Sequence, residues 1–253
     1  LFSLADNYGK FFYYDKAIDA YMAHFNRYPE SEDRALVLSR AAKAQLDNGE
    51  LVEAAQTYEL YADTFKGKDN APSALFEAGL LYEKLKNVSE QTRIFETFID
   101  RFSSKAGEDT RVLDANLRLA KIARARNRKK KTRKLLREVI GEFNKRAQQP
   151  ASRSANIAAE AGFELLAPRF NRFTRQRLKG SAKKQQKIVL RKLKELQSLI
   201  GEYTALATTY KSNTWTICSI LKQGKLWKDM NTTLSDAPEP QGLSDEMMGI
   251  YLD

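Results

Sequence analysis

Residues 71–87, APSALFEAGLLYEKLKN, read as an amphipathic helix followed by a turn. The opening Ala-Pro pair is typical of a helix start. Leu75, Ala78, Gly79 and Tyr82 recur at spacings of three and four, which places them on one face of that helix. Because Ala78 and Gly79 are small, a second helix can approach this face closely. The stretch therefore predicts one half of a packed helix pair.

The same pattern recurs every 37 residues on both sides of this stretch. A fixed period of this size is typical of a solenoid built from helix pairs. Four series of similar residues step by that spacing, namely Tyr21, Tyr58 and Phe95; Tyr28, Phe65 and Phe102; Leu38, Leu75 and Val112; and Ala41, Ala78 and Ala115.

The second helix of each pair is predicted after a turn near Asn48-Gly49 or Lys86-Asn87. In one unit its apolar stripe is Ala54, Tyr58, Tyr61 and Phe65, at i, i+4, i+7 and i+11. The period is expected to continue into a third full unit. The second-helix positions predicted there are Thr132, Leu135 and Val139.

These residues resemble the tetratricopeptide repeat (TPR) family. The resemblance implies an all-α fold, a TPR-like helix-pair solenoid followed by a C-terminal bundle of longer helices. The period of 37 departs from the usual 34 residues of the family. The matching positions are Leu75, Ala78, Gly79 and Tyr82 on a first helix, Ala54 and Tyr58 on a second, and Ala17, Tyr21 and Pro29 in the opening half-unit.

Two motifs are similar to repeat proteins of the bacterial cell envelope. The ending Tyr28-Pro29-Glu30-Ser31 resembles the long-repeat variety of outer-membrane assembly lipoproteins and Tol-system coordinators. The segment APEPQGLSDE at 237–246 resembles the C-terminal region of gliding-machinery repeat proteins, and Ser244 is a candidate N-cap of a last helix. These resemblances imply a periplasmic or outer-membrane-associated protein, with a cytoplasmic location as the alternative.

The predicted domains are TPR-like repeats over 1–143, a polar linker over 144–154 and a helical module over 155–253 that is truncated. Pro168 is expected to kink or break the first helix of that module. A later helix carries apolar residues in a 4-3 spacing, which favours lengthwise packing on another helix of the chain or on a second chain. These residues are Val189, Leu193, Leu196, Ile200, Tyr203, Ala207 and Tyr210.

Charge is concentrated in the middle of the chain. The formal net charge is +11, and residues 111–195 alone hold 26 Lys/Arg against 6 Asp/Glu. Three explanations stay open, namely solvated helix faces, a surface for an acidic protein or anionic lipid, and a nucleic-acid surface. The predicted basic patch is Arg124, Arg126, Arg128, Lys129, Lys130, Lys131, Arg133, Lys134, Lys183, Lys184 and Lys187.

Composition disfavours an enzyme. The 253 residues include one His, His24, and one Cys, Cys218, so His-pair and Cys-rich metal sites are not expected. His24 falls on a repeat stripe, and Cys218 is expected to be buried and inert. No glycine-rich phosphate loop and no apolar window long enough for a transmembrane helix occurs. We therefore expect no catalytic residues, no metal and no cofactor.

A stack of helix pairs leaves its first helices along one groove, which binds a peptide or helix of another protein. This predicts a non-enzymatic interaction scaffold whose partner carries an acidic segment; the alternative is a nucleic-acid-binding repeat protein that uses the basic block at 111–195. From the family register, the predicted groove residues are Ser39, Lys43, Asp47, Phe76, Glu83, Lys84, Leu117 and Lys121.

Overall fold

The structure, a computed structural model, describes residues 1–239 and Ser244, and within these it contains eleven α-helices and no β-strand. The predicted all-α fold is therefore confirmed. The first seven helices are α1 (Phe2–Lys10), α2 (Tyr14–Arg27), α3 (Arg34–Asp47), α4 (Leu51–Thr64), α5 (Ala71–Lys84), α6 (Val88–Phe102) and α7 (Asp109–Ala125). They are followed by α8 (Lys129–Lys145), α9 (Arg153–Arg175), α10 (Ala182–Tyr210) and α11 (Asn213–Ser235).

The chain divides into an N-terminal unit, Leu1–Thr132, and a C-terminal unit that begins at Arg133. The division falls inside α8. The predicted linker at 144–154 holds the end of α8, a short turn and the start of α9. Ser152 caps α9, because its hydroxyl accepts a hydrogen bond from the backbone N–H of Ala155 at 3.1 Å.

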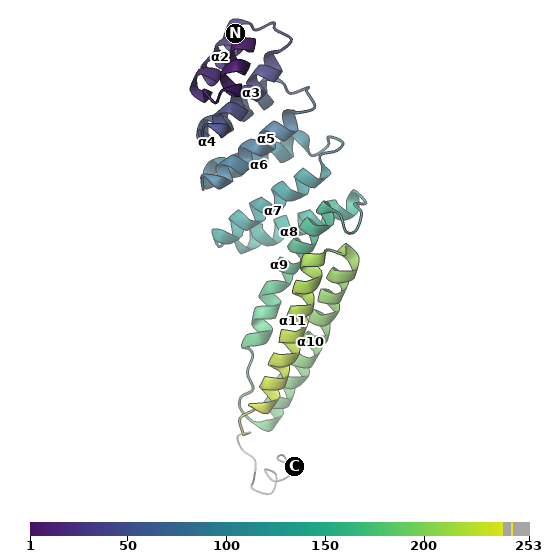
Figure 1. The fold of residues 1–253 in the computed structure, drawn as a ribbon. Helices are drawn as coiled ribbons and strands as arrows, with labels where there is room; N and C mark the ends of the chain where they lie inside the picture. The colour runs from purple at the N-terminus through teal and green to yellow at the C-terminus, as the bar shows by residue number, and fades with distance from the viewer. Residues whose placement is uncertain (240–243, 245–253) are drawn as a thin grey trace. The chain divides into compact units, whose positions relative to one another are not determined.

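In the N-terminal unit each helix packs on the next, from α1 to α7. The successive helix pairs α3/α4 and α5/α6 can be followed in Figure 1. The helices of the two pairs differ by one residue at most, and α5 begins 37 residues after α3. The stretch at 71–87 is α5 and its turn, so the predicted period is the period of the structure here.

A left-handed residue closes the first helix of each pair. Phe12, Gly49, Lys86 and Asn127 have φ values of 61°, 83°, 56° and 57°. After α3, the Glu50 N–H donates to the Gln45 carbonyl at 2.8 Å, in the pattern of a Schellman motif. This backbone turn sets the angle between the two helices of a repeat.

The last of these turns lies 41 residues after its predecessor instead of 37. Three of the four additional residues belong to α7, which has 17 residues where α3 and α5 have 14, so about one helical turn is inserted. The prediction for α8 is confirmed at Leu135 and Val139, which are buried, and is wrong at Thr132, which is only half-buried. The buried side of α8 also includes Leu136 and Phe143.

Ion pairs between successive repeats all run in one direction. In each pair the carboxylate belongs to the earlier repeat and the cation to the later one. Each repeat therefore presents carboxylates to the repeat that follows it and cations to the repeat that precedes it. The pairs are Asp6 with Arg40, Glu59 with Arg93, Asp63 with Arg101, Glu83 with Arg118, and Glu96 with Lys131.

The turn geometry gives a first testable prediction. We expect Gly49→Ala to lower the free energy of unfolding by about 1 kcal/mol, because an L side chain is disfavoured at positive φ. Gly67 is the matched control, since it has no positive φ and a methyl group there would meet nothing within 4 Å. Urea unfolding of both variants measures the difference. Equal stabilities would contradict the role of the left-handed turn.

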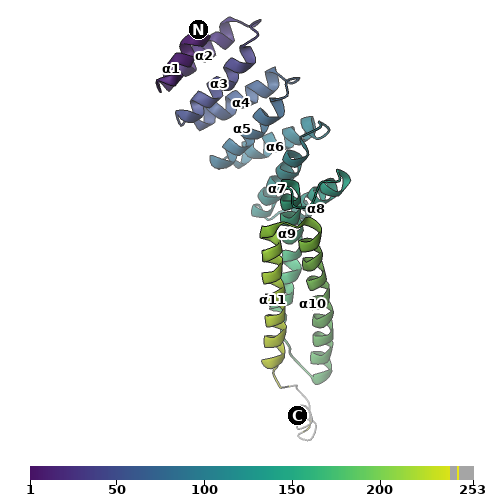
Figure 2. The ribbon, with the colours of Figure 1, turned by 45° about the vertical axis from the view of Figure 1, so that its right-hand side comes forward.

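In the C-terminal unit α9, α10 and α11 pack against one another, and both views show them side by side along their lengths (Figures 1 and 2). The helix α9 continues through Pro168, so the predicted break does not occur. Pro168 is exposed, while Leu166 and Phe170 on either side of it lie in the core. Packing of these neighbours outweighs the one backbone hydrogen bond that proline forgoes.

The packing stripe of α10 differs in part from the predicted one. Leu196, Tyr203 and Tyr210 are buried as expected, but Leu193 is 36% exposed. The other buried positions are displaced by one residue from those predicted. They are Lys192, Leu199 and Leu206, in place of Leu193, Ile200 and Ala207.

Candidate functional site

A surface pocket of about 310 Å³ opens between α1, α2 and α3. Two of the predicted groove residues line it, Lys43 and Asp47, which form an ion pair at 3.4 Å. Tyr14, Tyr21 and Arg40 complete the wall. The pocket therefore combines aromatic surface with charges of both signs.

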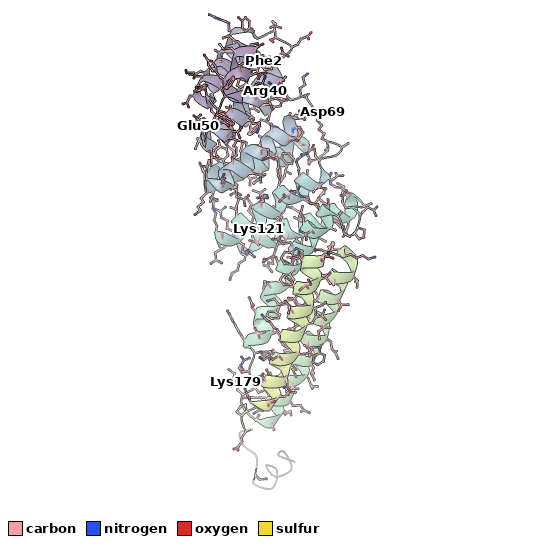
Figure 3. The ribbon with its side chains drawn as sticks, in the orientation of Figure 1. Phe2, Arg40, Glu50, Asp69, Lys121 and Lys179 are labelled. Carbon is pink, nitrogen blue, oxygen red and sulfur yellow. The ribbon has the colours of Figure 1, made fainter. Side chains whose placement is uncertain are left out.

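The wall of this pocket is held in place by a buried hydrogen-bond network. The Tyr21 hydroxyl donates to the Asp6 carboxylate at 2.5 Å, and Arg40 pairs with the same carboxylate. Burial raises the pKa of Tyr21, and the Asp6 carboxylate that accepts its hydrogen bond raises it further, to about 12. The Arg40 guanidinium also lies 5.1 Å from the ring centre of Phe2, and Figure 3 labels both residues. These contacts fix the tyrosine and leave little freedom in the pocket wall.

A second pocket, of about 210 Å³, lies one repeat later. It shares two repeat positions with the first pocket, since Tyr58 and Glu77 lie 37 residues after Tyr21 and Arg40. Its other lining residues correspond to positions outside the first pocket, and the predicted groove residue Ser39 is among them. Burial raises the pKa of Tyr58, and the carboxylates of Glu77 and Asp47 add to the effect.

The corresponding place in the third repeat is filled. There Phe95 is fully buried, packs on Phe76 with ring centres 5.4 Å apart, and closes over Gly79. Phe76 is 4% exposed and Leu117 3% exposed, so these two predicted groove residues are core residues. The family register placed them at the surface, but aromatic packing across α5 and α6 encloses Phe76.

The remaining predicted groove residues lie outside both pockets. Glu83, Lys84 and Lys121 are exposed on α5 and α7, and Figure 3 labels Lys121. Glu83 is bound to Arg118 of the next repeat. Ser39, Lys43 and Asp47 thus line the pockets together with Tyr21 and Tyr58, which were predicted on the apolar stripe of the repeat. Tyr21 is buried, as a place on that stripe implies.

The predicted basic residues are exposed. Within the C-terminal unit, Phe143 of α8 makes an edge-to-face contact with Tyr210 at the end of α10, with ring centres 5.2 Å apart. Lys183 lies in the first turn of α10, about 40 Å away along that helix. Arg133 is only about 15 Å from Phe143 along α8, so Arg133 and Lys183 of this unit do not lie on one surface. Some of the charges are already neutralised, since Lys131 binds Glu96 at 3.1 Å.

The two residues considered for catalysis have structural surroundings. His24 is buried between the rings of Phe2 and Tyr28, and Cys218 is a free thiol that is half-buried rather than buried. In the described part of the chain, no group of three His, Cys, Asp or Glu side chains could hold a metal ion. Among the same residues no helix is long and apolar enough to cross a bilayer.

Helix pairs that repeat along the chain, each closed by a left-handed turn, define a TPR-like helical-repeat fold. No protein-family model and no curated protein matches the chain.

Three solved structures align with most of the chain. BtubC (BKLC) from P. vanneervenii aligns with a TM-score of 0.45 and 13% identity, covering 92% of this chain and 96% of that one. A tetratricopeptide repeat protein from Parabacteroides merdae aligns with a TM-score of 0.42 and 10% identity, over 99% of this chain and 95% of that one. The TPR-like repeats of a kinesin light chain from Podosopora anserina give 0.40 and 13%, over 82% and 98%.

Proposed function

We propose that this protein is a non-enzymatic scaffold that binds an extended segment of a partner protein along the first-helix face of its N-terminal unit. The observation that supports the proposal is a pocket in each of two successive repeats, with Tyr21 and Tyr58 at the one aromatic position that both pockets share. An extended chain that crosses successive repeats can place one side chain in each pocket. Aromatic walls supply contact area at low entropic cost, because tyrosine has few rotatable bonds.

The charges of this face favour a partner with an acidic segment. Asp47 is paired with Lys43, and Glu83 with Arg118, so these carboxylates are neutralised within the protein. Lys84 is exposed and has no ion-pair partner among the described residues. A carboxylate of the partner is its natural complement, whereas Glu77 in the second pocket suits a neutral or hydrogen-bonding side chain.

Site-specific crosslinking tests the face. A photoreactive side chain at Ser39 or Lys84 is expected to label one discrete protein in cells. The same group at Gln56, which is exposed on α4 and lines neither pocket, serves as the matched control. Equal labelling from Gln56 would place the partner elsewhere.

Charge reversal then tests the chemistry of recognition. We expect Lys84→Glu combined with Lys121→Glu to weaken binding of the crosslinked partner by about tenfold or more, as for the loss of two charge contacts. The loss should shrink as salt is raised, because exposed charges are screened. Unchanged affinity of the double variant would rule out this face as the binding groove.

We further propose a location in the bacterial cell envelope, on the resemblance of the Tyr28-Pro29-Glu30-Ser31 ending. The matching resemblance of 237–246, including a last helix after Ser244, falls largely outside the described residues. Fractionation of cells that express the full gene product is the test. Recovery in the periplasm or outer membrane supports the location, and recovery in the cytosol overturns it.

Nucleic-acid binding is the less favoured alternative, because Lys131 is already in an ion pair and, within the C-terminal unit, Arg133 lies far from Lys183. If it were correct, generic RNA or DNA would bind at about micromolar affinity in low salt and dissociate steeply as salt is raised. We expect no such binding at about 50 mM salt.

A further inference from the structure

The two long helices of the C-terminal unit meet along a seam that is independent of the pockets described above. The Gln223 side-chain amide donates to the Thr204 hydroxyl at 3.3 Å, which fixes the antiparallel register of α10 and α11. With these two residues opposite each other, Ile200 lies opposite Trp227 and Leu193 opposite Leu234. The bond between Lys192 and Thr233, at 2.5 Å, agrees with this register.

The side of this seam that faces away from the core is apolar and exposed. Trp227 is 58% exposed and Leu234 48% exposed, and both share the helix stripe of Gln223 at i+4 and i+11. Apolar residues in a continuous row on the surface mark an interaction site. We call this row the outer seam and define it by Leu190, Leu193, Ile217, Ile220, Trp227 and Leu234.

Two glycines lie on the same side at facing heights. Gly201 is in the interior of α10 and Gly224 in the interior of α11, and a Cβ added at either would meet nothing within 4 Å. Glycine inside a helix costs about 1 kcal/mol relative to alanine. Packing within this chain does not require the small side chain at either position. Small residues are useful there if the backbone of another helix comes close.

The charge around the outer seam has one sign. The carboxylates of α10 and α11 point to other partners, since Glu195 and Glu202 bind Arg169 of α9 and Asp229 binds the buried Lys192. The lysines that border the seam have no ion-pair partner among the described residues. They are Lys183, Lys187 and Lys194 on the stripe of Leu190, and Lys228 next to Trp227.

We propose that the outer seam binds an acidic amphipathic helix of a partner protein, which packs on α10 and α11 as an additional helix of the bundle. A helix fits because two antiparallel helices present a lengthwise groove, and the glycines let it approach closely. The row from Ile217 to Leu234 spans about 26 Å, the length of roughly 18 helical residues. Acidic flanks on the partner would neutralise the bordering lysines.

A second copy of the chain fits this surface less well. A two-fold interface places the same patch on both subunits, so the lysines of one copy would face the lysines of the other. A flat bilayer surface would contact the tryptophan and lysines but would gain nothing from paired glycines. An acidic amphipathic helix is complementary to all three features of the outer seam, namely the apolar row, the two glycines and the bordering lysines.

Trp227 provides a direct readout of binding. In a Trp215→Phe background its fluorescence reports the seam alone, since the chain has two tryptophans. The probe is a synthetic three-heptad peptide without tryptophan, with Leu at the a and d positions and Glu at the others. We expect a shift of Trp227 emission to shorter wavelength and binding about tenfold or more tighter than for the same peptide with Lys in place of Glu.

Substitution of a seam glycine separates docking from folding. Gly224→Gln is expected to keep or raise helical stability, because glutamine favours helices more than glycine, yet to weaken peptide binding by about tenfold or more. Lys194→Glu should weaken it as well. Gly141→Gln is the matched control, since Gly141 is an exposed helix-interior glycine of α8 with open space around it.

Three results would overturn the proposal. Equal affinity for the Glu and Lys peptides would remove the acidic specificity. A dimer of the full chain in sedimentation analysis, abolished by Trp227→Gln, would make a second copy the occupant. A blue shift of Trp227 with anionic phosphatidylglycerol vesicles, but none with the Glu peptide, would make the seam a lipid-binding surface.

Discussion

Replacing Asp229 by alanine is expected to lower the free energy of unfolding of the C-terminal unit by about 3–5 kcal/mol. The reason is Lys192, whose side chain has no exposed surface in the middle of α10. Its ammonium group donates to the Asp229 carboxylate at 2.7 Å, the Gln176 carbonyl at 3.0 Å and the Thr233 hydroxyl at 2.5 Å. Loss of the carboxylate leaves a buried charge without its counter-ion.

A double substitution separates the pair from the packing around it. Lys192→Met combined with Asp229→Leu removes both charges and keeps apolar volume, so most of the lost stability should return. Glu138→Ala is the control, because Glu138 pairs with exposed Lys134 and should cost less than about 1 kcal/mol. Urea unfolding followed by circular dichroism measures all three. Similar losses for Asp229→Ala and Glu138→Ala would show that burial of Lys192 carries no special cost.

The second large effect is expected at Gly79, in the N-terminal unit. A methyl group at this position would lie 2.7 Å from Cε1 and 2.9 Å from Cζ of Phe95. Phe95 is fully buried and packs on Phe76, so its ring has little room to move. We expect Gly79→Ala to lower the free energy of unfolding by about 1–3 kcal/mol, measured by urea unfolding.

A control position and a compensating substitution test whether the contact with Phe95 causes the loss of stability. Gly9→Ala in α1 places the same methyl in open space and should be neutral or slightly stabilising, because alanine favours helices. In the Gly79→Ala background, Phe95→Leu should lower the free energy of unfolding by less than it does in the unaltered protein, since the smaller side chain relieves the contact. Strictly additive losses in this double-mutant cycle would show that the two residues are not in steric conflict.

The period of 37 predicted the helix pairs because equivalent positions in successive repeats have similar environments and therefore carry similar residues. It failed at Thr132 of α8, where the additional turn of α7 moved the register by about one helical turn. It also misplaced part of the stripe on α10. A lysine is expected at the surface, so Lys192 concealed the core row that it belongs to, and the neighbouring Leu193 was chosen instead.

Only the polar residues of the candidate site could be predicted from the sequence. Ser39, Lys43 and Asp47 follow from the family register and do line the pockets. Periodic aromatics normally fill the core, and Tyr21 does so at 5% exposed, whereas Tyr58 is half-buried. The position that faces them is charged in all three repeats, as Arg40, Glu77 and Asp114, so the sequence does not distinguish an open place from a filled one.

The one-way ion pairs give the repeats of the N-terminal unit a direction. Each repeat offers carboxylates to the one that follows, as Glu59 does to Arg93, and cations to the one before, as Arg40 does to Asp6. In a tandem duplication of the α5/α6 repeat, Glu96 of the first copy would take the place of Glu59, one period earlier, and would face Arg93 of the second copy. This repeat could therefore be duplicated while this contact is kept, a route by which the number of repeats can vary in evolution.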